Sequence, residues 1–166
     1  MRIALATGLL PVPPTYFALQ HGERLQAEHE VRMFTIAADI RDPAVSIEVD
    51  AALPSVGPWP ARIAAAFATA PLSSAVQARR IAAFAPDVVH VAAPFLLGGK
   101  AIAVCARAGI PSVAIYQTDV AGYLQRYGVG FARPMLDRFV AGVHALAGRT
   151  LAPTPGTAGA TSTRRR

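Results

Sequence analysis

Short apolar segments rich in β-branched residues alternate along the chain with longer segments in which apolar residues recur every three or four positions. The first pattern is typical of strands buried in a parallel sheet, and the second is typical of amphipathic helices. Together they predict an α/β fold with a Rossmann-like, doubly wound parallel sheet. We expect strands at residues 2–7, 31–37, 45–49, 88–92, 111–116 and 149–152. We expect helices at residues 16–28, 75–84, 99–108, 120–127 and 134–146.

Proline, serine and glycine mark the boundaries of the middle of the chain. Residues 54–72 are rich in Pro and Ala, and their pattern predicts no more than one or two helical turns. Ser73 or Ser74 is then a candidate N-cap for the helix at 75–84. Gly109 is a candidate for the left-handed position that ends the following helix.

A doubly wound sheet predicts where a ligand binds before any family is considered. In such sheets, ligands bind outside the carboxyl ends of the strands. Four loops lie at this edge of the expected sheet, at residues 7–14, 37–42, 92–99 and 117–127.

Length and composition are those of one folded domain. The chain has 166 residues, of which 53% are hydrophobic and 16% charged, which excludes a disordered acidic or basic protein. We expect a domain over residues 1–153 and a disordered basic tail over residues 154–166, which ends in three arginines. No apolar run reaches the ~18–20 residues of a membrane-spanning helix, and the apolar start is too short for a secretion signal. We therefore expect a cytoplasmic location.

The formal net charge of +6 comes from 15 Arg and one Lys against ten acidic residues. An Arg-rich surface suits phosphates, nucleotides or anionic lipid headgroups. The basic residues are spread along the chain and do not cluster with aromatic residues, which argues against nucleic-acid binding.

The residues that could carry redox or metal chemistry are few. Cys105 is the only cysteine, and its apolar, mid-helix setting indicates a buried core residue, whereas a nucleophilic thiol would need a nearby base. His21, His29 and His144 lack the spacing of metal ligands, so we expect no metal site. No G-x-G-x-x-G motif follows an expected strand, which argues against a nicotinamide-dependent oxidoreductase.

Two segments carry the most information about function. Residues 85–95 read Ala-Pro-Asp-Val-Val-His-Val-Ala-Ala-Pro-Phe, which resembles the "PDVVH" strand of GT-B glycosyltransferases. Residues 113–128 read Val-Ala-Ile-Tyr-Gln-Thr-Asp-Val-Ala-Gly-Tyr-Leu-Gln-Arg-Tyr-Gly, which resembles a segment of retaining, GDP-mannose-dependent α-mannosyltransferases of glycosyltransferase family 4. The resemblance runs over about residues 54–153. It implies the amino-terminal, acceptor-side half of a GT-B enzyme, which is built from two Rossmann-like domains.

The resemblance implies catalytic positions at Gln117 and Asp119. Relatives commonly carry a His at the position of Gln117, facing the anomeric centre, whereas an amide orients sugar hydroxyls but does not titrate. The resemblance implies that the donor phosphate takes the acceptor proton, so that no protein base is needed. Asp119 either binds acceptor or sugar hydroxyls or caps the helix that follows it.

The resemblance also implies substrate-binding positions at Gly8, His90, Pro94, Phe95, Thr118, Tyr123, Arg126 and Tyr127. Two of these assignments have structural alternatives. A single His at a strand end is also typical of a hydrogen-bonded core histidine, which is the alternative for His90. Tyr123 shares a helical face with Arg126 or Tyr127, and that face forms either an acceptor platform or a solvated helix edge.

The loop after the first strand departs from the family pattern. Relatives carry an acidic residue, a proline and Asn-Gly there, whereas this chain keeps only Gly8 and Pro11 and has three prolines within residues 11–14. Prolines lack the N–H donors that bind phosphate at the start of a helix. A phosphate-binding role for this loop is therefore not supported. Residues 8–52 as a whole are not matched to the family pattern.

We expect hexosyl transfer, with mannose from GDP-mannose as the donor group and a glycolipid or oligosaccharide as the acceptor. The resemblance implies that a carboxy-terminal domain, in cis or in trans, holds the donor, so the chain alone is expected to hold no cofactor and to be inactive. A glycolipid acceptor implies peripheral contact with the inner face of the plasma membrane. The alternative is a non-catalytic Rossmann-like module that binds a ligand or a partner protein. A domain that normally packs against a second one exposes apolar surface, so we expect self-association of the isolated chain.

Overall fold

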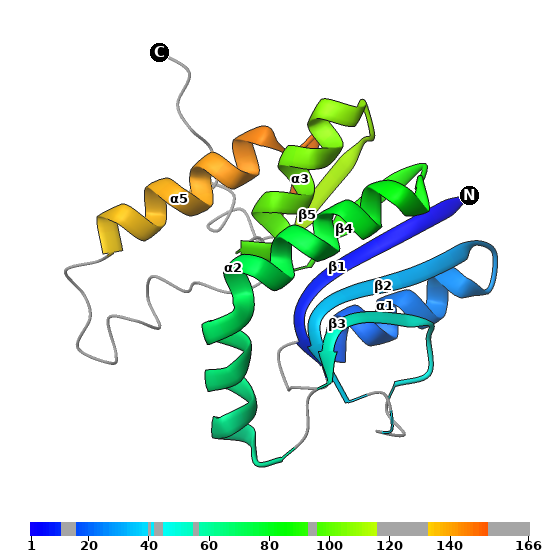
Figure 1. Ribbon diagram of the computed structural model, residues 1–166. Helices are drawn as coiled ribbons and strands as arrows, with labels where there is room; N and C mark the ends of the chain where they lie inside the picture. The colour runs from blue at the N-terminus through cyan, green and yellow to red at the C-terminus, as the bar shows by residue number, and fades with distance from the viewer. Residues whose placement is uncertain are drawn as a thin grey trace.

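The computed structural model describes residues 1–10, 16–39, 41, 45–54, 57–92, 96–115 and 133–152. These residues form a six-stranded, all-parallel sheet with the strand order β3-β2-β1-β4-β5-β6 (Figure 1). The strands are β1 (Arg2–Leu10), β2 (Glu30–Ala38), β3 (Val49–Pro54), β4 (Val88–Val91), β5 (Ser112–Ile115) and β6 (Arg149–Leu151). The helices are α1 (Tyr16–Gln26), α2 (Trp59–Phe84), α3 (Leu96–Ala108) and α5 (Arg133–Leu146). The expected Rossmann-like α/β fold is confirmed, since this strand order is that of dinucleotide-binding folds.

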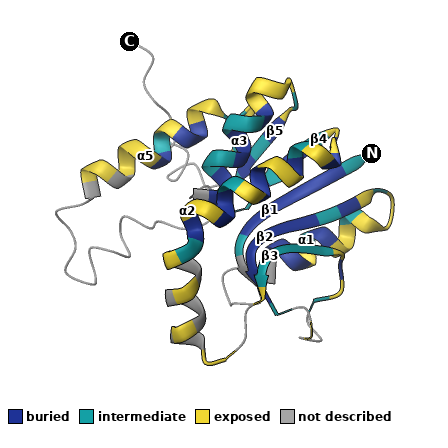
Figure 2. Ribbon diagram, viewed as in Figure 1, coloured by how far each residue is buried: buried dark blue, intermediate teal, exposed yellow. Residues whose placement is uncertain are grey.

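Helices cover both faces of the sheet, and each face has its own buried cluster. Alternate residues of β1 point to opposite faces, as the pleat of a strand requires. Ile3 and Leu5 pack with α1 and with one side of β2, whereas Ala4 and Ala6 pack with α2 and α3 on the other face. Figure 2 shows β1 and β2 as buried strands between these helices. The central position of β1 explains why its first residues are apolar without alternation.

Strand β1 is longer than the sequence predicts. We expected it to end at residue 7, with a loop from Gly8 onward, but Leu9 and Leu10 still pair with Ala37 and Ala38 of β2. The local sequence predicts a loop because prolines follow. In the structure, however, hydrogen bonds to the neighbouring strand β2 extend β1 as far as these prolines.

The position predicted for the third strand is wrong. We expected residues 45–49, but β3 spans Val49–Pro54 and pairs with β2 from Met33↔Val49 to Ala38↔Pro54. The prediction took Pro54 as a residue that ends strands. An edge strand tolerates proline because one side of its backbone makes no ladder bonds. Ile47, inside the predicted strand, is a buried core residue that precedes β3.

The predicted break before residue 75 is also wrong. A single helix, α2, runs from Trp59 to Phe84 with Pro71 inside it, and Ser73 and Ser74 are buried helical residues rather than N-caps. Proline removes one helical hydrogen bond and crowds the preceding turn, so it bends a helix. Figure 1 shows this bend in α2. The Lys100 ammonium group of α3 donates a hydrogen bond to the Pro71 carbonyl oxygen beside the bend.

Other expectations are confirmed. Gly109 has a φ of 69° directly after α3, and Cys105 is fully buried in the core. The helix expected at 120–127 and the tail expected at 154–166 lie outside the described residues. None of the described helices is both long and apolar enough to cross a bilayer.

Candidate functional site

The chain changes direction within the sheet between β1 and β4. After β1 it builds β2 and β3 on one side, and then returns to place β4 on the other side of β1. The connections after β1 and β4 therefore lead to opposite sides of the sheet, and in doubly wound folds the ligand-binding crevice lies between two such connections. Ligands of doubly wound folds bind at this switch point, so the ends of β1 and β4 form the candidate site.

Gly8, for which the resemblance implies substrate binding, lies near this edge, two residues before the end of β1. Its carbonyl oxygen accepts a 2.5 Å hydrogen bond from the Thr35 hydroxyl, which also donates to the Ala37 carbonyl oxygen at 3.2 Å. Among the described residues, no atom lies within 4 Å of the position that a Cβ on Gly8 would take. The backbone is thus held by β2, and no described side chain fills the space beside Gly8.

His90 lies on β4, one residue before its end, with its ring on the face of the sheet covered by α1. Its Nδ1 is 3.0 Å from Nε2 of His21 on α1, and the two rings meet edge to face with centroids 4.7 Å apart. One ring must donate the N–H and the other must accept it. The sequence does not reveal this pair, because 69 residues separate the two rings and no local pattern links them.

The environment of the pair keeps His90 neutral. Burial, and to a lesser extent the charge of His21, lowers the pKa of His90 to about 4. The pKa of His21 is also lowered, by burial first and by Arg24 second. Nε2 of His90 is inaccessible to solvent and has no hydrogen-bond partner among the described residues. In this arrangement the ring holds β4 against α1 and does not present a nitrogen to solvent.

Asp87 explains the start of the "PDVVH" motif in structural terms. Its carboxylate accepts a 2.7 Å hydrogen bond from the Arg2 backbone N–H, and its own N–H donates to the Arg2 carbonyl oxygen at 2.8 Å. These bonds align the start of β4 with the start of β1. The aspartate of this motif therefore has a structural role at the edge of the sheet opposite the candidate site.

Most of the predicted site residues belong to the segments that follow β4 and β5 in the chain. Pro94, Phe95, Gln117, Thr118, Asp119, Tyr123, Arg126 and Tyr127 lie outside the described residues. The strands that precede them are described, and β4 and β5 are neighbours that pair from Val89↔Ser112 to Val91↔Ala114. The two strands therefore end at the same edge of the sheet, side by side.

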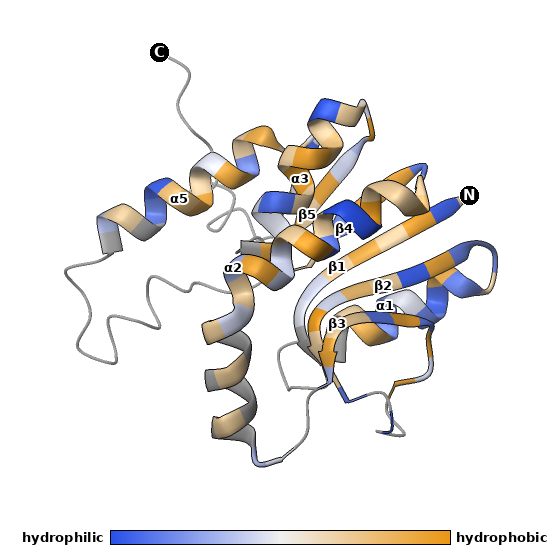
Figure 3. Cartoon of the chain, viewed as in Figure 1, coloured by the Kyte–Doolittle hydropathy of each residue, from blue (hydrophilic) through white to orange (hydrophobic). Residues whose placement is uncertain are grey.

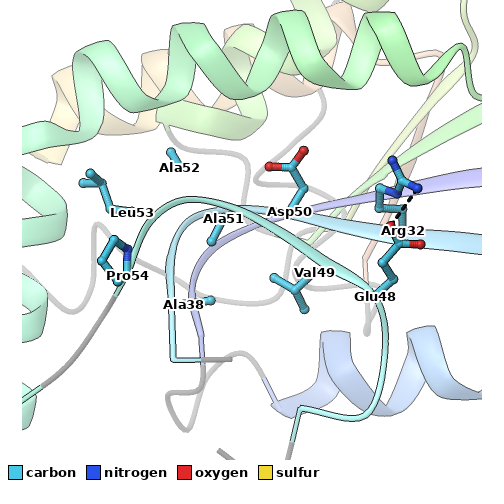
Figure 4. A pocket seen from close by; sticks show the side chains of 9 residues that line it. All are labelled: Arg32, Ala38, Glu48, Val49, Asp50, Ala51, Ala52, Leu53 and Pro54. Atoms are coloured by element: carbon cyan, nitrogen blue, oxygen red, sulfur yellow. Dashed lines mark ion pairs between the residues drawn. The ribbon is translucent and has the colours of Figure 1, made fainter. Parts of the chain in front are cut away.

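A groove of about 430 Å³ lies elsewhere, along the edge strand β3 (Figure 4). Arg32 and Glu48 in its wall form an ion pair at 2.7 Å. Asp50, also in the wall, is paired at 2.6 Å with Arg80, which lies outside the groove. The groove is lined by Arg32, Ala38, Glu48, Val49, Asp50, Ala51, Ala52, Leu53 and Pro54. The incorrect position predicted for the third strand hid this feature. We place the candidate site at the switch point, because the groove's charged side chains are already paired.

The described part of the chain contains no cluster of three His, Cys, Asp or Glu side chains that could hold a metal ion. Cys105 does not offer a reactive thiol, since burial raises its pKa to about 11. What the arrangement offers is an open backbone edge beside two central strands. Backbone groups at such an edge have the donors and acceptors that a polar ligand requires.

Solved structures with a similar fold include two sugar-nucleotide epimerases. The UDP-GlcNAc 2-epimerase of Neisseria meningitidis, bound to UDP-GlcNAc, matches 97% of this chain and 43% of its own with a TM-score of 0.57 and 14% identity. The UDP-GlcNAc 2-epimerase of Methanocaldococcus jannaschii matches 93% of this chain and 40% of its own with a TM-score of 0.51 and 10% identity. At this identity the likeness concerns the fold alone.

Three curated relatives share the name GDP-mannose-dependent alpha-mannosyltransferase. The protein of Mycolicibacterium smegmatis is 46% identical over 71 residues, which cover 43% of this chain and 19% of the relative. The protein of Mycobacterium tuberculosis is 43% identical over 79 residues, which cover 48% of this chain and 21% of the relative. The protein of Corynebacterium glutamicum is 45% identical over 69 residues, which cover 42% of this chain and 17% of the relative. The aligned part thus spans about a fifth of each relative.

The sequence model of Glycosyltransferase Family 4 matches residues 15–165. This range is wider than the 54–153 over which the motifs carry the resemblance, and it includes α1, β2 and β3. With nearly its whole length matched and a Rossmann-like sheet, the chain belongs to Glycosyltransferase Family 4.

Proposed function

We propose that this chain forms the acceptor side of a mannosyltransferase that moves a mannosyl group from GDP-mannose to a glycolipid or oligosaccharide. The observation that carries the proposal is the 43–46% identity to three proteins named GDP-mannose-dependent alpha-mannosyltransferase. The open edge at Gly8, beside the switch point, supports a polar ligand such as a sugar at this end of the sheet.

The donor side is proposed to belong to a second domain, on a longer form of this polypeptide or on another chain. The relatives are several times longer than the segment that aligns with this chain, which supports this division. Much of the rate of a transfer reaction comes from holding both reactants in position. A chain that binds only the acceptor is therefore expected to show no measurable turnover. A glycolipid acceptor would bring the chain to the inner face of the plasma membrane.

Calorimetric titration of the 166-residue chain tests this division of labour. We expect heat of binding with a short mannoside acceptor and none with GDP-mannose under the same conditions. Tight binding of GDP-mannose would overturn the proposal, because the donor site would then be complete in this chain. Binding of neither sugar would favour the alternative of a non-catalytic module.

A further inference from the structure

A polar side chain lies in the apolar second half of β2. Thr35 is the one polar residue within residues 33–38, and it is fully buried. Figure 3 shows the apolar character of β2 over most of its length. The Thr35 hydroxyl is shared between two acceptors, the Gly8 carbonyl oxygen of β1 at 2.5 Å and the Ala37 carbonyl oxygen at 3.2 Å. A buried hydroxyl requires such a partner, and here the partner belongs to the strand that ends at the candidate site.

The Gly8 carbonyl group departs from the alternation of a regular strand. Along a parallel strand between two neighbours, the carbonyl groups of successive residues point to opposite sides. The Arg2 carbonyl oxygen accepts the N–H of Asp87, just before β4, and the Ala6 carbonyl oxygen accepts the N–H of Ala92, just after β4. Gly8 is the next residue of this even-numbered series. Its carbonyl oxygen nevertheless bonds to β2, on the other side of β1.

A rotated peptide unit between Gly8 and Leu9 accounts for this departure. The pairing of β1 with β2 is interrupted at Gly8, although the residues on either side of it pair. In a trans peptide the N–H points away from the C=O. With the Gly8 carbonyl turned to β2, the N–H of Leu9 is directed to the side of β4, which has ended by this level. This N–H is therefore directed toward the switch point.

We propose that Thr35 is a positioning residue, whose hydroxyl holds the Gly8–Leu9 peptide so that the Leu9 N–H donates a hydrogen bond to an oxygen atom of the sugar acceptor. This inference rests on the proposed function, because it takes the acceptor to bind at the switch point. A donor that is fixed before the ligand arrives costs little ordering when the ligand binds. The loop that follows contains three prolines within residues 11–14, which have no N–H to offer, so a donor at Leu9 is one of the last before them.

Three variants separate positioning from stability. Thr35→Val removes the hydroxyl and keeps the shape of the side chain, so it should weaken binding of a short mannoside about tenfold in a calorimetric titration. Thr35→Ser keeps the hydroxyl and should bind within about twofold of the original chain. Ile81→Val, at a fully buried position of α2, is the matched control: it should lower stability as the loss of one buried hydrogen bond does, without changing the affinity. Equal affinities of Thr35→Val and the original chain, or equal losses in Thr35→Val and Ile81→Val, would overturn the proposal.

The Leu9 amide reports on the proposed donor directly. In the original chain its nuclear magnetic resonance should shift on adding the mannoside, and its hydrogen exchange should slow, because the N–H gains an acceptor. In Thr35→Val at saturating mannoside both effects should be smaller. Binding of the mannoside to the original chain with no change at the Leu9 amide would contradict the proposed donor.

A measurement without sugar distinguishes failure of this inference from failure of the proposed function. In the ligand-free chain, Thr35→Val should move the resonances of the Gly8 carbonyl carbon and the Leu9 amide more than Thr35→Ser or Ile81→Val does, because the peptide loses its anchor. Unchanged resonances would overturn the positioning role, whatever the chain binds. An original chain that binds no mannoside would overturn the proposed function and the donor role of Leu9, while the ligand-free resonances would still decide whether Thr35 orients the peptide.

Discussion

At the scale of single residues, His90 is the group whose ionisation the fold changes most clearly. Its pKa falls from 6.5 to about 4 because burial disfavours the charged ring and His21 adds repulsion. The charged groups that bear on the pair are His21 itself and Arg24, both on α1. A lowered pKa means that the unfolded chain binds more protons than the folded one between these two values.

The folded state should therefore lose stability as the pH falls from 6.5 to 4. The loss amounts to about 3 kcal/mol for the His90 ring, and it is absent above pH 6.5. His90→Asn and His90→Gln both remove the titration and should flatten this part of the curve of unfolding free energy against pH. Chemical denaturation at a series of pH values measures the curve. An unchanged slope in both variants would contradict the assignment.

The same two variants separate titration from contact. The amide nitrogen of asparagine takes the place of Nδ1 and can still reach His21, whereas that of glutamine takes the place of Nε2 and cannot. At pH 8, where the ring is neutral, His90→Asn should be more stable than His90→Gln by about 1 kcal/mol. Equal stability would mean that the His21–His90 hydrogen bond contributes little.

At the scale of elements, Gln77 joins helix α2 to two strands. The side chain is fully buried, and Nε2 donates to the backbone carbonyl oxygens of Thr35 on β2 and Asp50 on β3, both at 2.6 Å. One turn later, Arg80 binds the Asp50 carboxylate at 2.6 Å. A single helix thus holds the edge strand through backbone groups and through an ion pair.

Replacing Gln77 should loosen this edge of the sheet. Gln77→Leu removes the donor and should lower the free energy of unfolding by about 1–3 kcal/mol. Gln77→Glu should cost more, because a buried carboxylate would face two carbonyl oxygens and Asp50, and part of the loss should be recovered at low pH. Gln26→Glu on the exposed end of α1 is the control, with an expected change within about 0.5 kcal/mol. Urea unfolding of the three variants compares them, and equal values for both Glu variants would contradict a role for Gln77.

At the scale of the whole molecule, two places compete as binding sites. One is the switch point at the ends of β1 and β4, and the other is the groove along β3. They lie on different parts of the sheet, since β2 and β1 separate β3 from β4 (Figure 1). Family membership alone does not choose between them.

A map of backbone amide shifts on adding a mannoside acceptor distinguishes the two places. We expect the shifts to concentrate at Gly8 and Ala92, at the carboxyl ends of β1 and β4. The groove residues Val49, Ala51 and Leu53 should change little. Shifts confined to β3 would move the site to the groove, and the proposed acceptor position would then be wrong.

The motifs and the periodicity predict much of this fold, because the signals they use are local. The "PDVVH" run predicts β4 through its own β-branched residues, and Gly109 predicts the end of α3 through its left-handed backbone. The errors arise where contacts distant in sequence decide the outcome. Pro54 ends an edge strand that forms only against β2. Pro71 lies within α2, whose two halves are continuous across a bend.

Patterns within a few residues, or motifs read along the chain, are enough to specify the α/β class, the order of most elements and the family. Which side chains meet depends on the tertiary structure. His21 reaches His90, and Gln77 reaches Thr35 and Asp50, only because the crossovers of a doubly wound sheet bring α1 and α2 over particular strands.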